Sequence, residues 1–308
     1  MTTSDEVLAK EFSSHRAHLI GVAYRLTSTI SDAEDAVQEA WLRLSGLDED
    51  RREEIKDLRG WLTTVVGRIC LDRLRSAATR RERYVGPWLP EPIVTPLGVQ
   101  PGDDPLETVV RDEQVRLAAL VVLDKLTPEQ RVAFVLHDAF SVPFGEIAGI
   151  LGVTEATARQ HASRGRRAVA DAKVPDPAEL AEQRAVVEKL LIALASGDVD
   201  GVVAALHPDV VFAGDSDGKA RTARRHMVGA DKITRFMAGL VTMYGVHRIS
   251  LANLVLVNGE LGIAFPDLPA EGGYRAVDRR ITVFEVRDGQ VWRIYDIVNP
   301  DKLTHVRF

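Results

Sequence analysis

The spacing of apolar residues predicts helices in the first half of the chain. From Glu6 to about Arg83, apolar residues recur every three or four positions, as in Leu19, Ala23 and Leu26, which is the pattern of amphipathic helices. The same spacing returns at about Leu106 and continues to Lys173. Two prolines in "KVPDPAE" end this stretch, because proline cannot donate a backbone hydrogen bond to a continuing helix.

The pattern changes in the last third of the chain. Two helical segments are predicted at residues 179–196 and 198–206, and a third helix at "GADKITRFMAGL". Residues of alternating polarity then indicate strands, most clearly in "ITVFEVRDGQVWRIYDIV". There Asp288-Gly289 separates two period-two runs, which is a strong hairpin signal. We therefore expect an α+β domain at the C-terminal end.

A proline-rich segment separates the first two helical stretches. Six prolines fall between Pro87 and Pro105, together with several glycines, which is typical of a semi-extended linker. The linker also contains the apolar residues Trp88 and Leu89. Because neighbouring prolines leave the segment little conformational entropy to lose, we predict that these two side chains form a preorganised docking element.

Composition restricts the class of protein. A chain of 308 residues with 45% hydrophobic content can form several domains. The formal net charge of −6 excludes a globally basic nucleic-acid binder, so any basic surface is local. Residues 31–50 carry seven acidic side chains and one arginine, whereas residues 58–84 carry seven arginines and two acidic side chains. One predicted helix is therefore acidic and the next is basic.

Several kinds of site and location are not expected. The single cysteine, Cys70, cannot form an intramolecular disulfide, and its place on an apolar helix face predicts inert packing. The alternative is a redox-sensing thiol, for which the sequence offers no resolving cysteine. We found no charged leader, no apolar run long enough to cross a membrane and no phosphate-binding glycine motif, and the histidines show no metal-ligand spacing. We expect a cytoplasmic protein without membrane association, cofactor or metal.

The stretch from Leu126 to Val169 predicts a helix-turn-helix. Thr127 and Gln130 form a capping box at the start of one helix. "FGEIAGILGVT" then reads as a short helix that ends at Gly152, and Thr154 caps the helix that follows. In a helix-turn-helix this second helix enters the major groove of DNA.

The second helix has a basic outer face. Ala158, Ala162 and Val169 are spaced to face the core, which leaves six polar residues outward. Arginine and glutamine form bidentate contacts with guanine and adenine, and serine and threonine contact phosphates or bases. The alternative is a solvated basic helix. The predicted DNA-binding residues are Thr157, Arg159, Gln160, Ser163, Arg164 and Arg167.

The basic helix nearer the N-terminus is a second candidate for DNA binding. Leu62, Val66, Ile69 and Leu74 are spaced to face inward, and the arginines of the helix occupy other faces, where they suit a phosphate backbone. Trp61 either stacks on an unpaired base or belongs to the core. The candidate DNA-binding residues of this helix are Trp61, Arg68, Arg73 and Arg75.

Three motifs in this order resemble regions two and four of the extracytoplasmic-function (ECF) sigma factors of bacterial RNA polymerase. They are "SDAEDAVQEAWLRL", "LRGWLTTVVGRICLDRLRS" and the helix-turn-helix. The resemblance implies that residues 55–75 recognise and melt the minus-ten element and that residues 154–167 read the minus-thirty-five element. Gly67 departs from the family pattern, which usually has a polar residue or alanine there. The face implied for binding core polymerase is Asp32, Asp35, Gln38, Glu39, Trp41 and Leu42.

The C-terminal domain resembles the SnoaL-like cone fold, in which a curved sheet wraps a pocket. Sigma factors with this extension carry a "WLPEP" linker and a terminal "NPDKL", and both motifs are present. A third motif has Ser216 and Asp217 where glycines are expected, which puts the conformation of its loop in question. The interdomain or regulatory residues implied by these motifs are Trp88, Leu89, Pro90, Asp215, Lys219, Asn299, Pro300, Asp301, Lys302 and Leu303.

The last predicted strand supplies a possible pocket. Trp292, Ile294, Asp296 and Val298 share one face of the strand by the period-two rule. Because SnoaL-like cones include cyclases and isomerases that use a pocket Asp or His, the candidate pocket residues are Asp296 and Trp292. The alternative is a structural Asp296, either buried and paired with an arginine such as Arg279 or Arg280 or bonded to a turn that it stabilises.

Together these observations predict a non-enzymatic sigma factor that binds the RNA polymerase core enzyme and promoter DNA. The predicted fold has two all-α sigma domains followed by an α+β SnoaL-like cone that regulates activity in cis. The expected boundaries are residues 1–85 for region two, 86–112 for the linker, 113–173 for region four and 178–308 for the cone. One alternative is a DNA-binding regulator that does not join polymerase. Another is a bifunctional protein whose cone is an enzyme or a sensor of an unknown small-molecule ligand.

Overall fold

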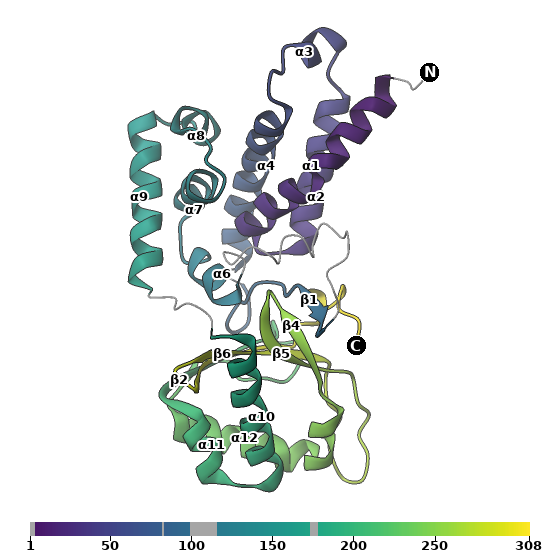
Figure 1. Cartoon of the computed structure of the whole chain (residues 1–308), viewed down its shortest axis with the longest axis vertical. Helices are drawn as coiled ribbons and strands as arrows, with labels where there is room; N and C mark the ends of the chain where they lie inside the picture. Colours follow the sequence, from purple (N-terminus) through teal and green to yellow (C-terminus); the bar gives the residue numbers. More distant parts are fainter. Residues whose placement is uncertain (1–3, 82, 99–115, 173–177) are drawn as a thin grey trace. The chain divides into compact units, whose positions relative to one another are not determined.

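The computed structural model describes residues 4–81, 83–98, 116–172 and 178–308, and it contains two compact units (Figure 1). The first unit comprises Met1–Glu82 and Pro101–Val174, and the second comprises Arg83–Gln100 and Pro175–Phe308. The described part of the linker, residues 83–98, therefore belongs to the same unit as the C-terminal α+β domain. No helix in the described ranges is long and apolar enough to cross a membrane.

Four helices form the first half of the first unit. They are α1 (Ser4–Thr27), α2 (Ile30–Ser45), the short α3 (Glu49–Glu53) and α4 (Leu58–Arg81). α1, α2 and α4 pack against one another, and their buried faces supply a core that includes Leu19, Leu26, Ile30, Leu44 and Leu62. The helical spacing predicted for this stretch is confirmed.

The described residues 116–172 of this unit are also mainly helical. It contains α6 (Leu117–Leu123), α7 (Pro128–Phe134), a π-helical turn (Val135–Ala139), α8 (Phe144–Leu151) and α9 (Glu155–Asp171). The capping box of Thr127 and Gln130 is present at the start of α7, as predicted. The π-helical turn was not predicted, because the apolar spacing around it does not differ visibly from that of an α-helix.

The C-terminal unit is a seven-stranded sheet with helices. The strand order is β1-β4-β5-β6-β7-β2-β3, and every neighbouring pair is antiparallel except β2 and β7. The strands are β1 (Val94–Pro96), β2 (Leu206–Asp215), β3 (Met227–Val228), β4 (Asn253–Val257), β5 (Glu260–Phe265), β6 (Arg280–Arg287) and β7 (Gln290–Ile297). The helical elements are α10 (Leu180–Ser196), α11 (Val199–Ala205), α12 (Ala230–Tyr244) and 3-10 turns at Val246–Leu251 and Pro300–Lys302.

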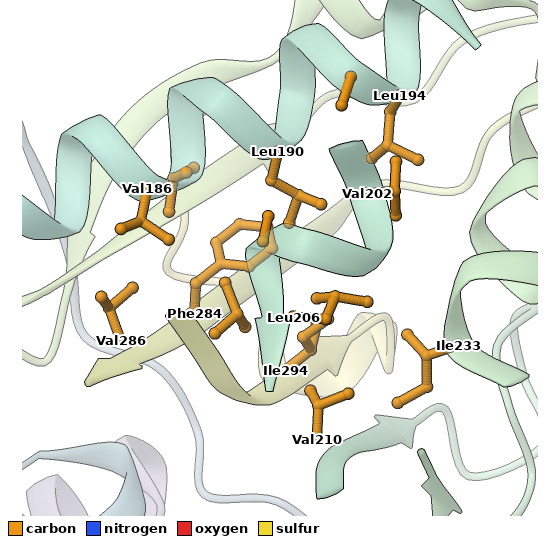
Figure 2. Close-up of a cluster of buried hydrophobic side chains, with 14 of the residues drawn as sticks. Val186, Leu190, Leu194, Val202, Leu206, Val210, Ile233, Phe284, Val286 and Ile294 are labelled. Carbon is orange, nitrogen blue, oxygen red and sulfur yellow. The ribbon is translucent and has the colours of Figure 1, made fainter. Parts of the chain in front are cut away.

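The predicted hairpin is present in this unit, and the helices and the sheet share a hydrophobic core. β6 and β7 are joined at Asp288 and Gly289, whose φ angles of 50° and 71° suit the tight turn that the sequence indicates. The helices lie against one face of the sheet and enclose a cluster of buried side chains, in which the ring of Phe284 extends from β6 toward Leu190 of α10 (Figure 2). The three helices predicted for this domain agree with α10, α11 and α12.

One strand comes from the linker. β1 pairs with β4 at the edge of the sheet, where the missing N–H of Pro96 is tolerated. Beside this pair, the backbone N–H of Ile93 donates to Asn258 Oδ1 at 3.1 Å, and the N–H of Asn258 donates to the Ile93 carbonyl at 2.8 Å. The linker was expected to be only extended, so this strand is a finding. The rest of the predicted linker, from residue 99 onward, lies outside the described residues.

Candidate functional site

The helix-turn-helix has the predicted local geometry. α8 ends at Gly152, which adopts the left-handed conformation with φ of 68°. The Thr154 side chain then caps α9 by accepting a hydrogen bond from the Thr157 N–H at 3.2 Å. Both residue choices follow from backbone chemistry, because glycine has no Cβ to clash at positive φ and a threonine oxygen satisfies a free N–H at the start of a helix.

The outer face of α9 is largely as the spacing predicts. Arg159, Gln160, Ser163, Arg164 and Arg167 are exposed, and Thr157 is partly exposed. Ala158 and Ala162 are buried, as expected.

The third buried position of α9 differs from the prediction. Val169, predicted to face the core, is only partly buried, and Gly165 takes that place instead. A Cβ at Gly165 would lie 2.7 Å from the Phe134 Cβ, so α9 and α7 approach each other too closely there for a side chain.

Two arginines of α9 have partners within the first unit. Arg159 forms an ion pair with Glu155 on the same helix, and its guanidinium lies 5.1 Å from the centre of the Phe144 ring. Arg166, which was not among the predicted DNA contacts, pairs with Asp138 at 2.7 Å. Because the pair with Glu155 is exposed, it contributes little stability and does not prevent Arg159 from contacting DNA.

The inner face of α4 is confirmed. Leu62, Val66, Ile69 and Leu74 are all buried. Cys70 is also fully buried, and burial raises the pKa of its thiol to about 12, so the thiol is inert in the folded protein.

Trp61 is partly buried at the start of α4. It lines a surface hollow together with Leu47, Ile55 and Lys56. The position allows both interpretations of Trp61, as a packed side chain and as a platform for a base.

The three candidate DNA-binding arginines of α4 bond to other groups of the same unit. Arg68 donates to the Gly149 carbonyl of α8 at 3.3 Å, and Arg75 contacts Glu129 of α7 at 3.1 Å. Arg73 donates to Asp32 of α2 at 2.9 Å. Region-four atoms therefore bond to two of the arginines predicted to contact DNA.

Gly67 lies where α8 packs on α4. A Cβ at this position would lie 3.0 Å from Leu136 Cδ1 and 3.4 Å from Ile150 Cδ1. Leu136 and Ile150 are both buried. The departure of Gly67 from the family pattern thus has a structural explanation, because the missing side chain lets region four approach α4 closely.

Arg131 is a buried contact that the sequence analysis missed. Only 1% of its surface is exposed. Its Nε and one terminal nitrogen donate to the Arg25 carbonyl of α1 at 3.0 and 2.9 Å, and it also bonds to Ser28 and Asp124. The available signal was its spacing of four residues from the buried Val135 on a predicted amphipathic face. Arg131 connects region four to the end of α1.

The predicted polymerase-binding face lies on α2. Gln38 and Leu42 are exposed, and 61% of the Leu42 surface is accessible, which suits a docking surface. Trp41 packs against Phe12 with ring centres 5.0 Å apart.

The acidic members of this face already contact arginines. Glu39 pairs with Arg43 at 2.5 Å, and Asp32 and Asp35 both contact Arg73, at 2.9 and 3.5 Å. The two contacts of Arg73 join α2 to the basic helix α4, whereas the pair of Glu39 and Arg43 lies within α2.

Asp215 is the centre of a buried cluster between the linker and the sheet. Its side chain is fully buried at the end of β2. One carboxylate oxygen accepts hydrogen bonds from the Leu89 N–H at 2.6 Å and from Lys302 Nζ at 2.7 Å, and the other accepts from the Tyr84 hydroxyl. We call the contacts made by Tyr84, Trp88, Leu89, Asp215, Asn299 and Lys302 the linker clamp.

Lys302 and Tyr84 complete the clamp. Lys302 also donates to the Leu89 carbonyl, and its Nζ lies 3.9 Å from the centre of the Trp88 ring. Asn299 donates to the Tyr84 hydroxyl at 2.8 Å. Burial and the Asp215 carboxylate raise the pKa of Tyr84, so its hydroxyl remains a donor. Tyr84 was not predicted, because it precedes the "WLPEP" motif.

The remaining predicted regulatory residues lie around the clamp. Lys219 pairs with Asp301, whose bond raises the pKa of Lys219. Leu303 is fully buried, Pro90 is buried, and Pro300 begins the last 3-10 turn.

The loop of residues 215–219, which lacks two expected glycines, still forms a tight turn. Asp217 adopts φ of 49°, a left-handed conformation that aspartate tolerates better than most residues. Ser216 Oγ accepts a hydrogen bond from the Gly218 N–H at 3.1 Å. Asp217 also accepts from the Val85 N–H at 3.2 Å, so this loop contacts the linker directly.

Asp296 lies at a cavity inside the cone, as predicted. It accepts hydrogen bonds from Thr222 at 2.6 Å and Thr282 at 3.1 Å, and Arg280 lies 3.5 Å away. The interpretation of Asp296 as a buried carboxylate paired with arginine thus describes its surroundings. The prediction for Trp292 is wrong, because Trp292 does not line the cavity and stacks on His207 with ring centres 3.4 Å apart. It lies near the start of β7, before the strand reaches the cavity.

Three family models match the chain. Sigma-70 region 2 matches residues 12–80, Sigma-70 region 4 matches residues 116–169, and the SnoaL-like domain matches residues 187–294. These matches confirm the predicted fold class, with two helical sigma domains followed by a SnoaL-like α+β domain.

Similar proteins match over nearly the whole chain. The chain is 55% identical over 299 residues to the ECF RNA polymerase sigma factor SigJ of Mycobacterium tuberculosis, covering 96% of this chain and 92% of that protein. It is 32% identical over 316 residues to the probable sigma factor SigI of the same species, covering 100% and 98%. The crystal structure of M. tuberculosis SigJ matches with a TM-score of 0.80 at 52% identity, covering 96% and 98% of the two chains. This chain belongs to the ECF sigma factors of RNA polymerase and carries a C-terminal SnoaL-like domain.

Proposed function

We propose that the free protein holds regions two and four in a closed arrangement that hides DNA-contacting groups of region two. The observation that carries this proposal is the pairing of Arg75 with Glu129, supported by the bond from Arg68 to the Gly149 carbonyl. A guanidinium that bonds to region four cannot at the same time bond fully to a phosphate. The closed arrangement therefore competes with promoter binding.

The buried contacts add to this closure. Gly67 allows α8 to pack closely on α4, and Arg131 bonds to the Arg25 carbonyl at the end of α1. Separating the two regions would break the hydrogen bonds of Arg131 to the Arg25 carbonyl and to Ser28, and would lose the close packing at Gly67. The two regions thus separate only if binding to polymerase and DNA supplies the free energy of opening.

In the open state, each predicted surface has a separate role. The α2 face of Asp32, Asp35, Gln38, Glu39, Trp41 and Leu42 binds core polymerase. Trp61, Arg68, Arg73 and Arg75 contact the minus-ten element, and the outer face of α9 reads the minus-thirty-five element as duplex DNA. Residues that reach a base edge contribute about 1–3 kcal/mol each to discrimination.

The cone regulates these events through the linker clamp. Tyr84 follows the last residue of α4 by three positions and is fixed to the cone through Asp215 and Asn299. The chain that leaves region two is therefore attached to the cone almost at once. Releasing the clamp frees more residues of the linker, so regions two and four can move further apart.

We infer that the cone is regulatory and not catalytic. A general base needs a lone pair directed at its substrate. Both oxygens of Asp296 accept hydrogen bonds from threonines, and Arg280 lies beside one of them. The carboxylate is thus held by protein groups.

A charge-neutral substitution tests the closed arrangement. Glu129→Gln removes the negative partner of Arg75, so the affinity of the free protein for promoter DNA should rise by up to about fivefold, the value of a partly exposed ion pair. The matched control is Glu188→Gln, which removes the same charge from the pair with Arg184 on α10. Equal affinities for the two variants in a fluorescence-anisotropy titration would contradict the proposal.

A further inference from the structure

The cone contains an apolar cavity of about 130 Å³ that is open to the surface on one side. Its walls come from helices α10 and α12 and from the sheet, and include Leu194, Phe212, Met237, Val241, Phe284 and Ile294. Leu194, Phe284 and Ile294 also belong to the buried core, where Figure 2 shows them between the helices and the sheet. The cavity lies entirely within the C-terminal unit.

The size of the cavity limits what it can hold. An engineered apolar cavity of about 150 Å³ binds benzene, so a cavity of similar volume accepts a single aromatic ring or a short alkyl chain. Met237, Leu240 and Val241 line the cavity and are partly exposed, which makes α12 its accessible side. The flexible thioether chain of Met237 can move to admit a ligand.

The cavity wall carries unequal numbers of charged groups. Among the described residues, the charged side chains that line it are Arg248, Arg280 and Asp296, and all three are buried. Two cations therefore face one anion. An uncompensated charge in an apolar, buried site is costly, so the site favours an occupant that brings one negative charge.

The two arginines differ in how well they are bonded. Arg248 donates to the carbonyls of Arg275 and Pro269, both at 3.0 Å. Arg280 has only long contacts with oxygen, at 3.3 Å to the Arg221 carbonyl, 3.4 Å to the Asp278 carbonyl and 3.5 Å to Asp296. Bonds between a guanidinium and a carboxylate are ordinarily about 2.7–2.9 Å long.

Asp296 does not fully satisfy Arg280, because threonines hold its oxygens at shorter distances. The Thr222 hydroxyl lies 2.6 Å from the oxygen that Arg280 faces. Gly214 makes this possible, since a Cβ there would lie 2.2 Å from the Thr222 hydroxyl. Arg280, whose guanidinium also lies 5.7 Å from the centre of the cavity-lining Tyr244 ring, thus lacks a carboxylate at short distance.

We propose that this cavity binds a small apolar carboxylate, such as an aromatic monocarboxylate, whose carboxylate pairs with Arg280. The ring or chain occupies the apolar space against Phe284 and Ile294, and the carboxylate balances the charge of the wall. The site lies in the cone alone, so its occupancy does not depend on the closed arrangement of regions two and four.

Three probes of equal size and different charge test this assignment on the full-length protein. Ligand-observed NMR titrations would compare phenylacetate, neutral 2-phenylacetamide and cationic phenethylamine. We expect phenylacetate to bind at least about tenfold more tightly than the amide, because hydrogen bonds to charged groups are stronger than neutral ones. We expect phenethylamine to bind most weakly. Equal affinities for phenylacetate and the amide, or no binding of phenylacetate at millimolar concentration, would overturn the proposal.

Two neighbouring arginines provide a variant and its matched control. Arg280→Met should remove the preference for phenylacetate over the amide. Arg279→Met should keep it, because Arg279 is exposed and pairs with Asp267 outside the cavity. Loss of the preference in both variants, or in neither, contradicts a role for Arg280.

A second variant should change the affinity for phenylacetate in the opposite direction. Asp296→Asn removes the negative charge that competes for Arg280, so phenylacetate should bind several-fold more tightly, and weaker binding would overturn the proposal. This outcome also distinguishes the site from a catalytic one. Promoter binding by Glu129→Gln is measured without any probe, so failure of the closed arrangement and failure of the cavity site are separate results.

Discussion

Gly67→Ala is the most direct perturbation of the closed arrangement of regions two and four. The added Cβ would lie 3.0 Å from Leu136 Cδ1 and 3.4 Å from Ile150 Cδ1. Leu136 has no exposed surface, so its methyl group cannot move aside without disturbing the packing around it. Overpacking of this kind costs about 1–3 kcal/mol. The cost arises only while the π-helical turn that carries Leu136 and the helix α8 pack against α4.

The same substitution also raises the helix propensity of position 67. Alanine stabilises a helix interior by about 1 kcal/mol relative to glycine. This gain applies to α4 in both the closed and the open state, so it cancels in the equilibrium between them. The net expectation is therefore a shift toward the open state by about 5- to 150-fold, the range that corresponds to 1–3 kcal/mol.

Gly149→Ala is the matched control, because Gly149 lies within α8 and an added Cβ there would meet no atom within 4 Å. The assay is energy transfer between dyes on cysteines introduced at the exposed positions Asp50 and Asp171. Gly67→Ala should show a larger low-transfer population than Gly149→Ala. Promoter-specific transcription with core polymerase should rise in parallel. Identical transfer distributions for the two variants would refute the reasoning.

Three further predictions concern the recognition helix, the linker clamp and the buried thiol. Arg159→Ala should weaken promoter binding by about 1–3 kcal/mol if Arg159 contacts a base edge; Arg184→Ala, which breaks a similar intrahelical pair in the cone, should leave it unchanged. Trp88→Ala should lower the free energy of unfolding by about 2 kcal/mol, because Lys302 loses a buried cation–π contact; an unchanged urea midpoint would show that the contact is not stabilising. Because burial raises the pKa of Cys70 to about 12, iodoacetamide should modify it only as fast as the protein unfolds, and rapid alkylation at neutral pH would contradict its burial.

Much of the fold could be predicted because its signals are local. The capping box at Thr127, the glycine stop at Gly152 and the Asp288-Gly289 turn each depend on residues within a few positions, and all three are present. The buried face of α4 follows from helical spacing alone. Local backbone chemistry therefore determined where these elements begin and end.

The contacts between regions two and four could not be read from the sequence. The spacing of Arg131 from Val135 was a local sign of burial, but the groups that bond to it at the end of α1 lie more than a hundred residues earlier in the chain. Gly67 could be recognised as a departure from the family, but the reason for it is a side chain on another helix. Such long-range packing has no local pattern.

The prediction for β7 shows the same limit within one strand. Period-two spacing correctly put Ile294 and Asp296 on one face, but it could not tell where along the strand the cavity begins, and Trp292 lies outside it. Nor could it reveal that β7 runs parallel to β2, which places Gly214 beside Asp296 and Asp215 beside Ile297.

That register brings the two candidate regulatory sites together. Asp296 faces the cavity, whereas Asp215, one position further along the neighbouring strand, bonds to the linker. The Val298 N–H donates to the Asp215 carbonyl at 2.8 Å, so the end of β7 is tied to the clamp residue. A ligand carboxylate that draws Arg280 away from Asp296 would act on the pairing of β7 with β2. The next residue of β2 is Asp215, which bonds to Leu89 and Lys302. If the strands transmit this change, phenylacetate should speed hydrogen exchange at the Leu89 N–H in the wild-type protein but not in Arg280→Met, and equal exchange in both would show that the cavity and the clamp are independent.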